Sequence, residues 1–182
     1  MRIARLYRLY GFCAVILCVA VPPGSLHVTA QAATSSGGYA PTFELGGDVQ
    51  HPGIVTRDML RRYPPTTVDV AFVNGATAEQ GAFTGALLWN LVQTAGLIVT
   101  PGLKNGALRK YIVVTGSDGY QVVLALAEIL PQYGGQPVLI AYQRDGKSLG
   151  PDQGMARLIV PNDKRGGRDV NNIIRVVVRG AE

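Results

Sequence analysis

Short runs of β-branched and aromatic residues, separated by turns rich in glycine and proline, dominate the sequence from Thr42 onward. The clearest pair of runs is 110–115 and 120–124, which the Asp118-Gly119 turn joins into a hairpin. Five further runs predict strands: 43–45, 66–73, 138–142, 157–160 and 172–179. Helical periodicity is limited to three short segments: 57–62, 87–95 and 125–130. Strands outnumber helices and do not alternate with them, which predicts an α+β domain with mixed sheets rather than a doubly wound one.

The first 32 residues have the layout of a secretory leader. Three arginines precede the apolar run 11–21, residues 22–24 break the run, and Ala30-Gln31-Ala32 forms a small-x-small cleavage site. This order predicts a signal peptide over 1–32 and a periplasmic or secreted protein. The apolar run is about half of the roughly 20 residues that cross a bilayer, so we expect no permanent membrane anchor.

Removal of the leader changes the chemistry of the chain. Cys13 and Cys18 belong to the leader, so the predicted mature domain has no disulfide, no thiolate metal ligand and no cysteine nucleophile. The leader also takes three of the 17 basic residues, which leaves 14 against 12 acidic ones. Because no basic stripe is present, we expect no nucleic-acid partner. Residues 33–41 predict a flexible segment before a domain at 42–182.

Sequence patterns for catalysis and metal binding are missing from the predicted domain. His51 is its single histidine, and one histidine without cysteine makes no conventional zinc site. The sequence has no dinucleotide-binding glycine pattern and no Walker loop. Ser117 or Ser148 beside His51 would make a serine–histidine pair, which spacing alone does not establish. We therefore assign no catalytic residue and no metal ligand.

The order of motifs between residues 111 and 178 is more specific than any single motif. The strings in order are YIVVTGSDGY, LAEI, VLIAY, RDGKSL and ARLIVP, followed by a Gly-Gly-Arg loop and a last strand. This order resembles the molybdopterin-binding domain of the sulfite oxidase family, especially its small, stand-alone exported members. Segment 83–91 matches the same pattern, so the resemblance covers about 43–179. It implies the sulfite-oxidase-type α+β fold, with mixed sheets and short helices.

The resemblance also implies a cofactor, molybdopterin, whose molybdenum is held by one protein cysteine. That cysteine belongs to the strand that here reads 68–73, and by the spacing to Trp89 its place falls at or near Phe72. A phenylalanine has no lone pair for a metal, whereas this centre uses a soft thiolate ligand. Asn171 and Asn172 replace the family's basic–aromatic pair, so the lysine that would meet the pterin is also absent. We therefore expect no thiolate-bound molybdenum, and the resemblance leaves molybdopterin itself open.

The strongest binding candidate is the loop that carries Lys164, Arg165 and Arg168. Three cations and two glycines can bring guanidinium groups and backbone N–H groups onto an anion such as a phosphate. The alternative is a solvated surface turn.

Three further residues are binding candidates by position. Asp118 and Tyr120 either line a pocket at the hairpin end or form a tight turn, and the turn is the favoured interpretation. Arg157 opens an apolar strand, and we expect it to form a structural salt bridge, with Asp118 or Glu128 as partner, unless it faces a ligand.

These observations favour an exported binding module of the sulfite oxidase-like family that lacks the cysteine ligand of molybdenum. Its ligand would be an anionic small molecule or a periplasmic protein partner. The alternatives are a molybdopterin-dependent oxidoreductase with atypical metal ligation, and a pure interaction module without a small ligand.

Overall fold

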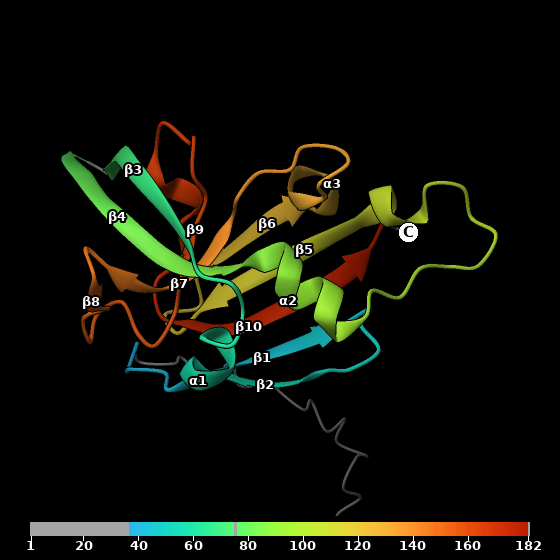
Figure 1. The fold of residues 1–182 in the computed structure, drawn as a ribbon, viewed down its shortest axis with the longest axis horizontal. Helices are drawn as coiled ribbons and strands as arrows, with labels where there is room; N and C mark the ends of the chain where they lie inside the picture. The colour runs from blue at the N-terminus through green and yellow to red at the C-terminus, as the bar shows by residue number, and fades with distance from the viewer. Residues whose placement is uncertain (1–36, 75, 182) are drawn as a thin grey trace, which may run out of the picture. The chain divides into compact units, whose positions relative to one another are not determined.

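Two five-stranded sheets form the frame of the described residues, 37–74 and 76–181, in the computed structural model (Figure 1). The first sheet has the strand order β2-β1-β10-β5-β6. Its strands are β1 (Thr42–Gly47), β2 (Gly53–Thr56), β5 (Lys110–Gly116), β6 (Gln121–Ala125) and β10 (Ile173–Gly180). β1 and β10 are parallel, whereas the other neighbours are antiparallel. The sheet is therefore mixed, as predicted.

The second sheet is built on the long hairpin of β3 and β4. Its order is β3-β4-β7-β8, and β9 pairs with β7 on the other side. The strands are β3 (Thr66–Asn74), β4 (Thr77–Leu87), β7 (Leu139–Arg144), β8 (Lys147–Ser148) and β9 (Arg157–Ile159). β3 and β4 pair along their whole length, from Thr66 opposite Gly85 to Asn74 opposite Thr77.

Short helices connect the strands. They are α1 (Arg57–Leu60), α2 (Leu88–Ala95), α3 (Leu126–Ile129) and the 3-10 turns η1 (Gly106–Arg109) and η2 (Gly166–Arg168). The Thr56 hydroxyl accepts a hydrogen bond from the Met59 N–H and so caps α1. α2 ends at Gly96, whose φ of 75° lies in the left-handed region that glycine adopts at low cost.

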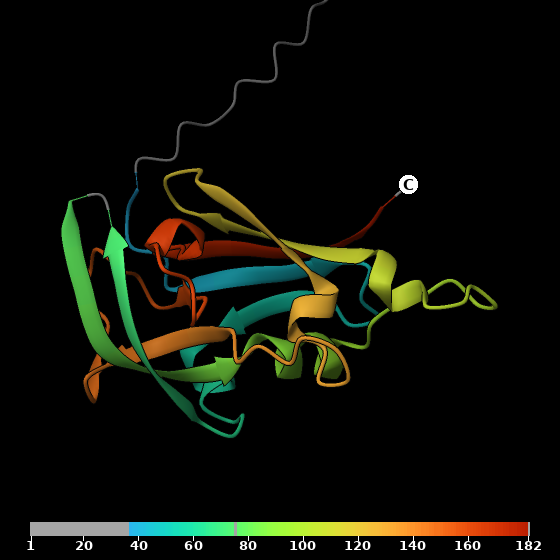
Figure 2. The ribbon, with the colours of Figure 1, turned by 90° about the horizontal axis from the view of Figure 1, so that it is seen from above.

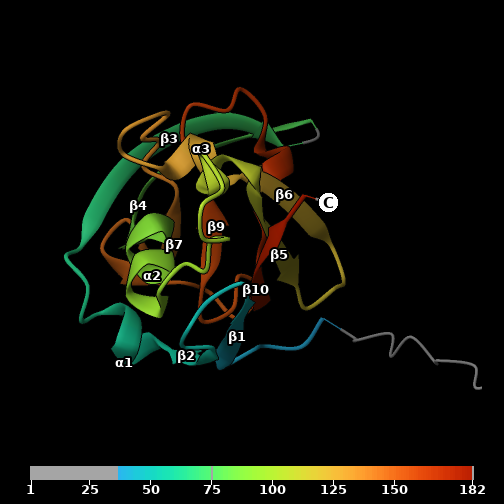
Figure 3. The ribbon, with the colours of Figure 1, turned by 90° about the vertical axis from the view of Figure 1, so that its right-hand side faces the viewer.

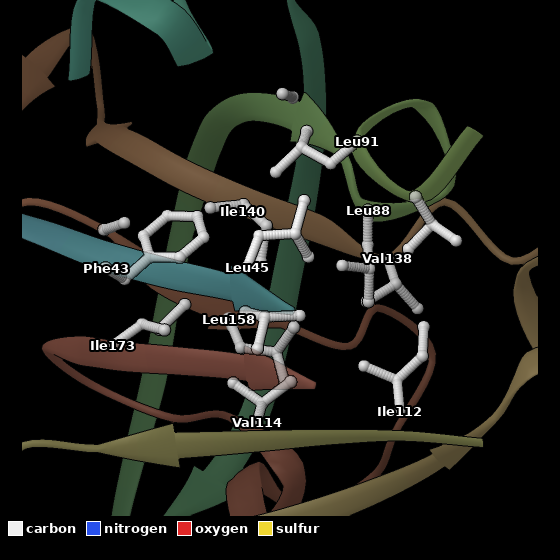
Figure 4. Close-up of a cluster of buried hydrophobic side chains, with 14 of the residues drawn as sticks. Phe43, Leu45, Leu88, Leu91, Ile112, Val114, Val138, Ile140, Leu158 and Ile173 are labelled. Carbon is white, nitrogen blue, oxygen red and sulfur yellow. The ribbon is translucent and has the colours of Figure 1, made fainter. Parts of the chain in front are cut away.

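The core lies between the two sheets. Figure 2 shows the blue, red and yellow strands of the first sheet above the orange strand and the lower part of the green β3–β4 hairpin, whose other end rises beside the first sheet. Alternate residues of β5 and β6 point inward, which produces the period of two that the sequence displays. Figure 4 shows the side chains that meet there: Phe43, Leu45, Leu88, Leu91, Ile112, Val114, Val138, Ile140, Leu158 and Ile173. Burial of each such side chain contributes about 1.5–3 kcal/mol.

The structure corrects the sequence-based prediction around β4. Residues 83–85 were expected to lead into a helix, but they continue an 11-residue strand that ends at Leu87. Gly85 allows this strand to lie against β7, because a Cβ there would stand 2.2 Å from the Ile140 carbonyl oxygen. β2 and β8 were also not predicted, since both are too short to show an alternating pattern.

Part of the sequence-based prediction lies outside the described residues. This applies to the leader at 1–32, to the beginning of the segment 33–41, and to Gly75 of the predicted Asn74-Gly75 turn. None of the described helices has both the length and the apolar character that crossing a membrane requires.

Candidate functional site

The end of β3 packs directly against the basic loop. The Phe72 ring is 5% exposed, and a Cβ on Gly166 would stand only 2.5 Å from its Cε2 atom. The Val73 N–H donates a hydrogen bond of 3.4 Å to the Lys164 carbonyl, and a parallel bridge joins Val73 to Arg165. The position that the resemblance gives to a cysteine is thus filled by a phenyl ring beneath the loop.

Arg157 is a second neighbour of the Phe72 ring. Its side chain is 3% exposed, and its Nη1 and Nη2 donate to Oε1 and Oε2 of Glu79 at 2.6 and 3.0 Å. The guanidinium carbon also lies 5.1 Å from the Phe83 ring centroid and 5.9 Å from that of Phe72. A bidentate pair over aromatic faces is a geometry that arginine favours. The hydrogen bonds from Arg157, opposed by burial, lower the pKa of Glu79.

The sequence-based partner of Arg157 was therefore wrong. A salt bridge forms as expected, but with Glu79 rather than with Asp118 or Glu128. Glu79 belongs to the part of β4 that was not recognised as a strand. Its separation of 78 residues from Arg157 gives no local sequence signal for the pair.

A second carboxyl group, Asp169, lies near the same guanidinium. Its Oδ1 accepts a hydrogen bond from the Val160 N–H at 2.9 Å, and its Oδ2 lies 3.7 Å from Arg157 Nη2. Burial raises the pKa of Asp169 to about 6, against the lowering effects of the Val160 N–H and the Arg157 charge.

Arg168 is held by two carboxylates, although its side chain remains partly exposed. Its Nε and Nη2 donate to Asp163 at 2.7 and 2.8 Å, and its Nη1 donates to Glu128 at 2.7 Å. These carboxylates raise the pKa of Arg168. Glu128 also accepts a hydrogen bond from the Ala125 N–H at the start of α3. Arg168 therefore fastens the loop to α3, and within 37–74 and 76–181 only Lys164 and Arg165 of the three loop cations have no carboxylate partner.

Tyr120 and Asp118 lie at the hairpin end but have different roles. The Tyr120 hydroxyl donates a 2.6 Å hydrogen bond to the Gly167 carbonyl, which ties the hairpin to the basic loop. Asp118 accepts from the Tyr120 N–H at 2.9 Å inside the turn. The fold thus brings Tyr120 and the three loop cations together, whereas Asp118 serves the turn.

Two cavities lie near this group of residues, one lined by Arg157 and the other by Phe72. The larger is polar, has a volume of about 530 Å³, and is lined by Thr77, Glu79, Arg144, Gln153, Arg157 and Asn171 among others. The smaller, of about 240 Å³, is lined by Asp69, Phe72, Asn162, Asp163 and Lys164 among others. Glu79 and Gln153 were not identified from the sequence, since no motif includes them, and Arg144 was included in the RDGKSL string without being a candidate site residue.

Asn171 and Asn172, which precede β10, have different environments. Asn171 lines the larger cavity. Asn172 is buried, and its Nδ2 donates to the Ser117 hydroxyl and the Gly38 carbonyl at 2.6 and 2.7 Å. Its Oδ1 accepts from the Ala40 N–H at 2.8 Å. Asn172 therefore joins the segment before β1 to the β5–β6 hairpin.

Comparison with known proteins agrees with this architecture. The family model "Oxidoreductase molybdopterin binding domain" matches residues 39–182. The chain belongs to this family. Among solved structures, the crystal structure of the sulfane dehydrogenase SoxCD from Paracoccus pantotrophus is similar, with a TM-score of 0.62 and 19% identity. The match covers 75% of this chain and 37% of the SoxCD chain, so it supports the fold. No curated protein matches the chain.

Proposed function

We propose that this chain is an exported binding module of the molybdopterin-binding-domain family that lacks a thiolate-held molybdenum centre. Its ligand carries an anionic group, on a small molecule or on a periplasmic protein partner, and contacts Lys164 and Arg165. The observation that carries this proposal is the position of Phe72, whose ring packs against Gly166 and lies 5.9 Å from the Arg157 guanidinium carbon.

The side chains around Phe72 do not fit a thiolate-held metal. No cysteine occurs in 37–74 or 76–181, and both carboxylate oxygens of Glu79 already accept hydrogen bonds from Arg157. No group of three or more histidine, cysteine or acidic side chains able to hold a metal occurs in these same ranges. We therefore derive no reaction step through molybdenum.

Two features of the loop support anion binding. Lys164 and Arg165 are exposed, and their charges are not matched by a carboxylate in the described ranges. Gly167 next to them is exposed, and a Cβ there would meet no atom within 4 Å, so a ligand can approach the backbone closely. An anion at this place gains charge-assisted hydrogen bonds without breaking an existing ion pair.

Titration of the exported protein with inorganic phosphate, followed by NMR of the backbone amides, tests this proposal. We expect saturable shifts at residues 164–167 and their loss in the double variant Lys164→Ala/Arg165→Ala. The control is Lys104→Ala/Lys147→Ala, which removes the same charge from exposed sites elsewhere. Equal shifts in both double variants, or none in the wild type, would contradict the proposal.

One observation favours the alternative of a molybdopterin-dependent oxidoreductase with atypical ligation. The polar cavity of about 530 Å³ next to Arg157 falls in the size range of small-molecule and cofactor sites. This alternative predicts a bound pterin, a visible-range absorption spectrum and activity with an artificial electron acceptor. A colourless, pterin-free exported protein would rule it out.

A further inference from the structure

A second surface, built by other elements than those around the basic loop, has the properties of a peptide-binding groove. It lies between β2, α1 and α2, which Figure 3 shows together at one side of the domain. Two cavities of about 200 and 300 Å³ share Met59, Tyr63 and Thr94 in their walls. The two cavities are therefore neighbours, and we call them together the β2–α1 groove, with the cavity of about 200 Å³ as its inner part and that of about 300 Å³ as its outer part.

The groove has an apolar floor and exposed apolar sides. Leu45 and Leu91 form part of the floor and are almost fully buried. Ile54 and Met59 stand at the sides and are 56% and 41% exposed. Large apolar side chains that remain exposed around a hollow are a common sign of an interaction site. Methionine also adapts its shape to different partners.

The size of the inner cavity limits what can enter it. A cavity of about 150 Å³ accepts a benzene ring in an engineered protein. The inner part of the β2–α1 groove, at about 200 Å³, therefore has room for one large apolar side chain. The edge of the sheet is available next to it, because β2 is the terminal strand and pairs only with β1.

The charges around the groove select the partner. No acidic side chain lines either cavity, whereas Arg62 lines the outer one and His51 the inner one. Arg62 is exposed and forms no ion pair with any residue of 37–74 or 76–181. An apolar anchor followed by a carboxylate would complement this arrangement, with the anchor in the inner cavity and the carboxylate at Arg62.

We propose that the β2–α1 groove binds an extended, acidic peptide segment of a partner protein, through one large apolar anchor residue and a carboxylate at Arg62. This surface is separate from the anion-binding loop, so either proposal can fail without the other.

Selection of random 12-residue peptides on the immobilised, exported protein tests the groove. We expect the enriched peptides to carry one large apolar residue flanked by Asp or Glu. Fluorescence anisotropy with the most enriched peptide then measures affinity. Arg62→Glu should weaken binding about fivefold, because an attractive surface charge becomes a repulsive one. Met59→Glu should weaken binding about tenfold, since it places a charge in the apolar contact.

The matched control is Arg179→Glu, which makes the same change of charge at an exposed position of β10. It should leave the affinity unchanged, and circular dichroism should show all three variants folded. Enrichment without acidic residues, or equal affinities for Arg62→Glu and Arg179→Glu, would overturn the proposal. Concentration-dependent dimerisation abolished by Met59→Glu, or binding to anionic vesicles abolished by Arg62→Glu, would also overturn it, in favour of a second copy or a membrane surface.

Discussion

Arg157 and Glu79 form a two-point ion pair, with N–O distances of 2.6 and 3.0 Å, that joins β9 to the β3–β4 hairpin. The pair also holds the guanidinium over the Phe83 ring, 5.1 Å from its centroid. Arg157 thereby contributes to the packing of the site wall rather than offering its charge to a ligand.

Removal of Glu79 should destabilise the domain strongly. Glu79→Ala leaves the buried Arg157 without its main partner, which typically costs about 3–5 kcal/mol. The double variant Glu79→Gln/Arg157→Met removes both charges and should lose much less. Urea unfolding monitored by circular dichroism measures both free energies of unfolding. A double variant less stable than Glu79→Ala would contradict this account of the pair.

Stability should depend on pH through Asp169. Its pKa in the folded protein is raised to about 6, above the value of 3.8 for the free side chain, so the folded state binds the proton more tightly than the unfolded state. The contribution of Asp169 to stability is therefore largest below its unfolded pKa and is lost as the pH rises through about 6. Asp169→Asn should remove this dependence, so the variant should gain stability relative to wild type between pH 4.5 and pH 7. Urea unfolding of both proteins at these two pH values is the measurement, and a difference that does not change with pH would contradict the assignment.

Arg168 should matter for the loop rather than for a ligand. Arg168→Gln removes the hydrogen bonds to Asp163 and Glu128, and since this network is partly exposed we expect a loss of about 1 kcal/mol. Lys164→Ala should change the free energy of unfolding by less than about 0.5 kcal/mol, because its side chain is exposed. Amide hydrogen exchange at residues 166–168 should accelerate only in Arg168→Gln. Equal acceleration in both variants would contradict the role of Arg168 in holding the loop to α3.

The contact between Gly166 and Phe72 should show as coupling between two substitutions. Gly166→Ala forces a methyl group against the Phe72 ring, and such overpacking costs about 1–3 kcal/mol. In a Phe72→Leu background the same substitution should cost less, because the smaller side chain leaves room. A double-mutant cycle of unfolding free energies measures the difference. Additive effects would mean that the loop moves away from Phe72.

The sequence was sufficient to predict the elements whose own residues show a clear apolar pattern. The hairpin of β5 and β6 was predictable because apolar residues alternate on both sides of Asp118-Gly119. β4 could not be predicted over its full length. Gly81 and Gly85 interrupt its alternation of apolar residues, and its length depends on pairing with β3 and β7. The salt bridge of Arg157 was predicted but its partner Glu79 was not, since the two are 78 residues apart, and the contact of Arg168 with Glu128 spans 40 residues.

The molybdenum content of the natively produced protein tests the central claim most directly. Plasma mass spectrometry of protein purified from its native host, beside a cysteine-containing sulfite oxidase family enzyme prepared identically, gives the metal-to-protein ratio. Since the family resemblance puts the cysteine ligand at or near Phe72, and no cysteine occurs in 37–74 or 76–181, we predict only background molybdenum in this protein and a stoichiometric amount in the reference enzyme. Stoichiometric molybdenum in both preparations would contradict the account.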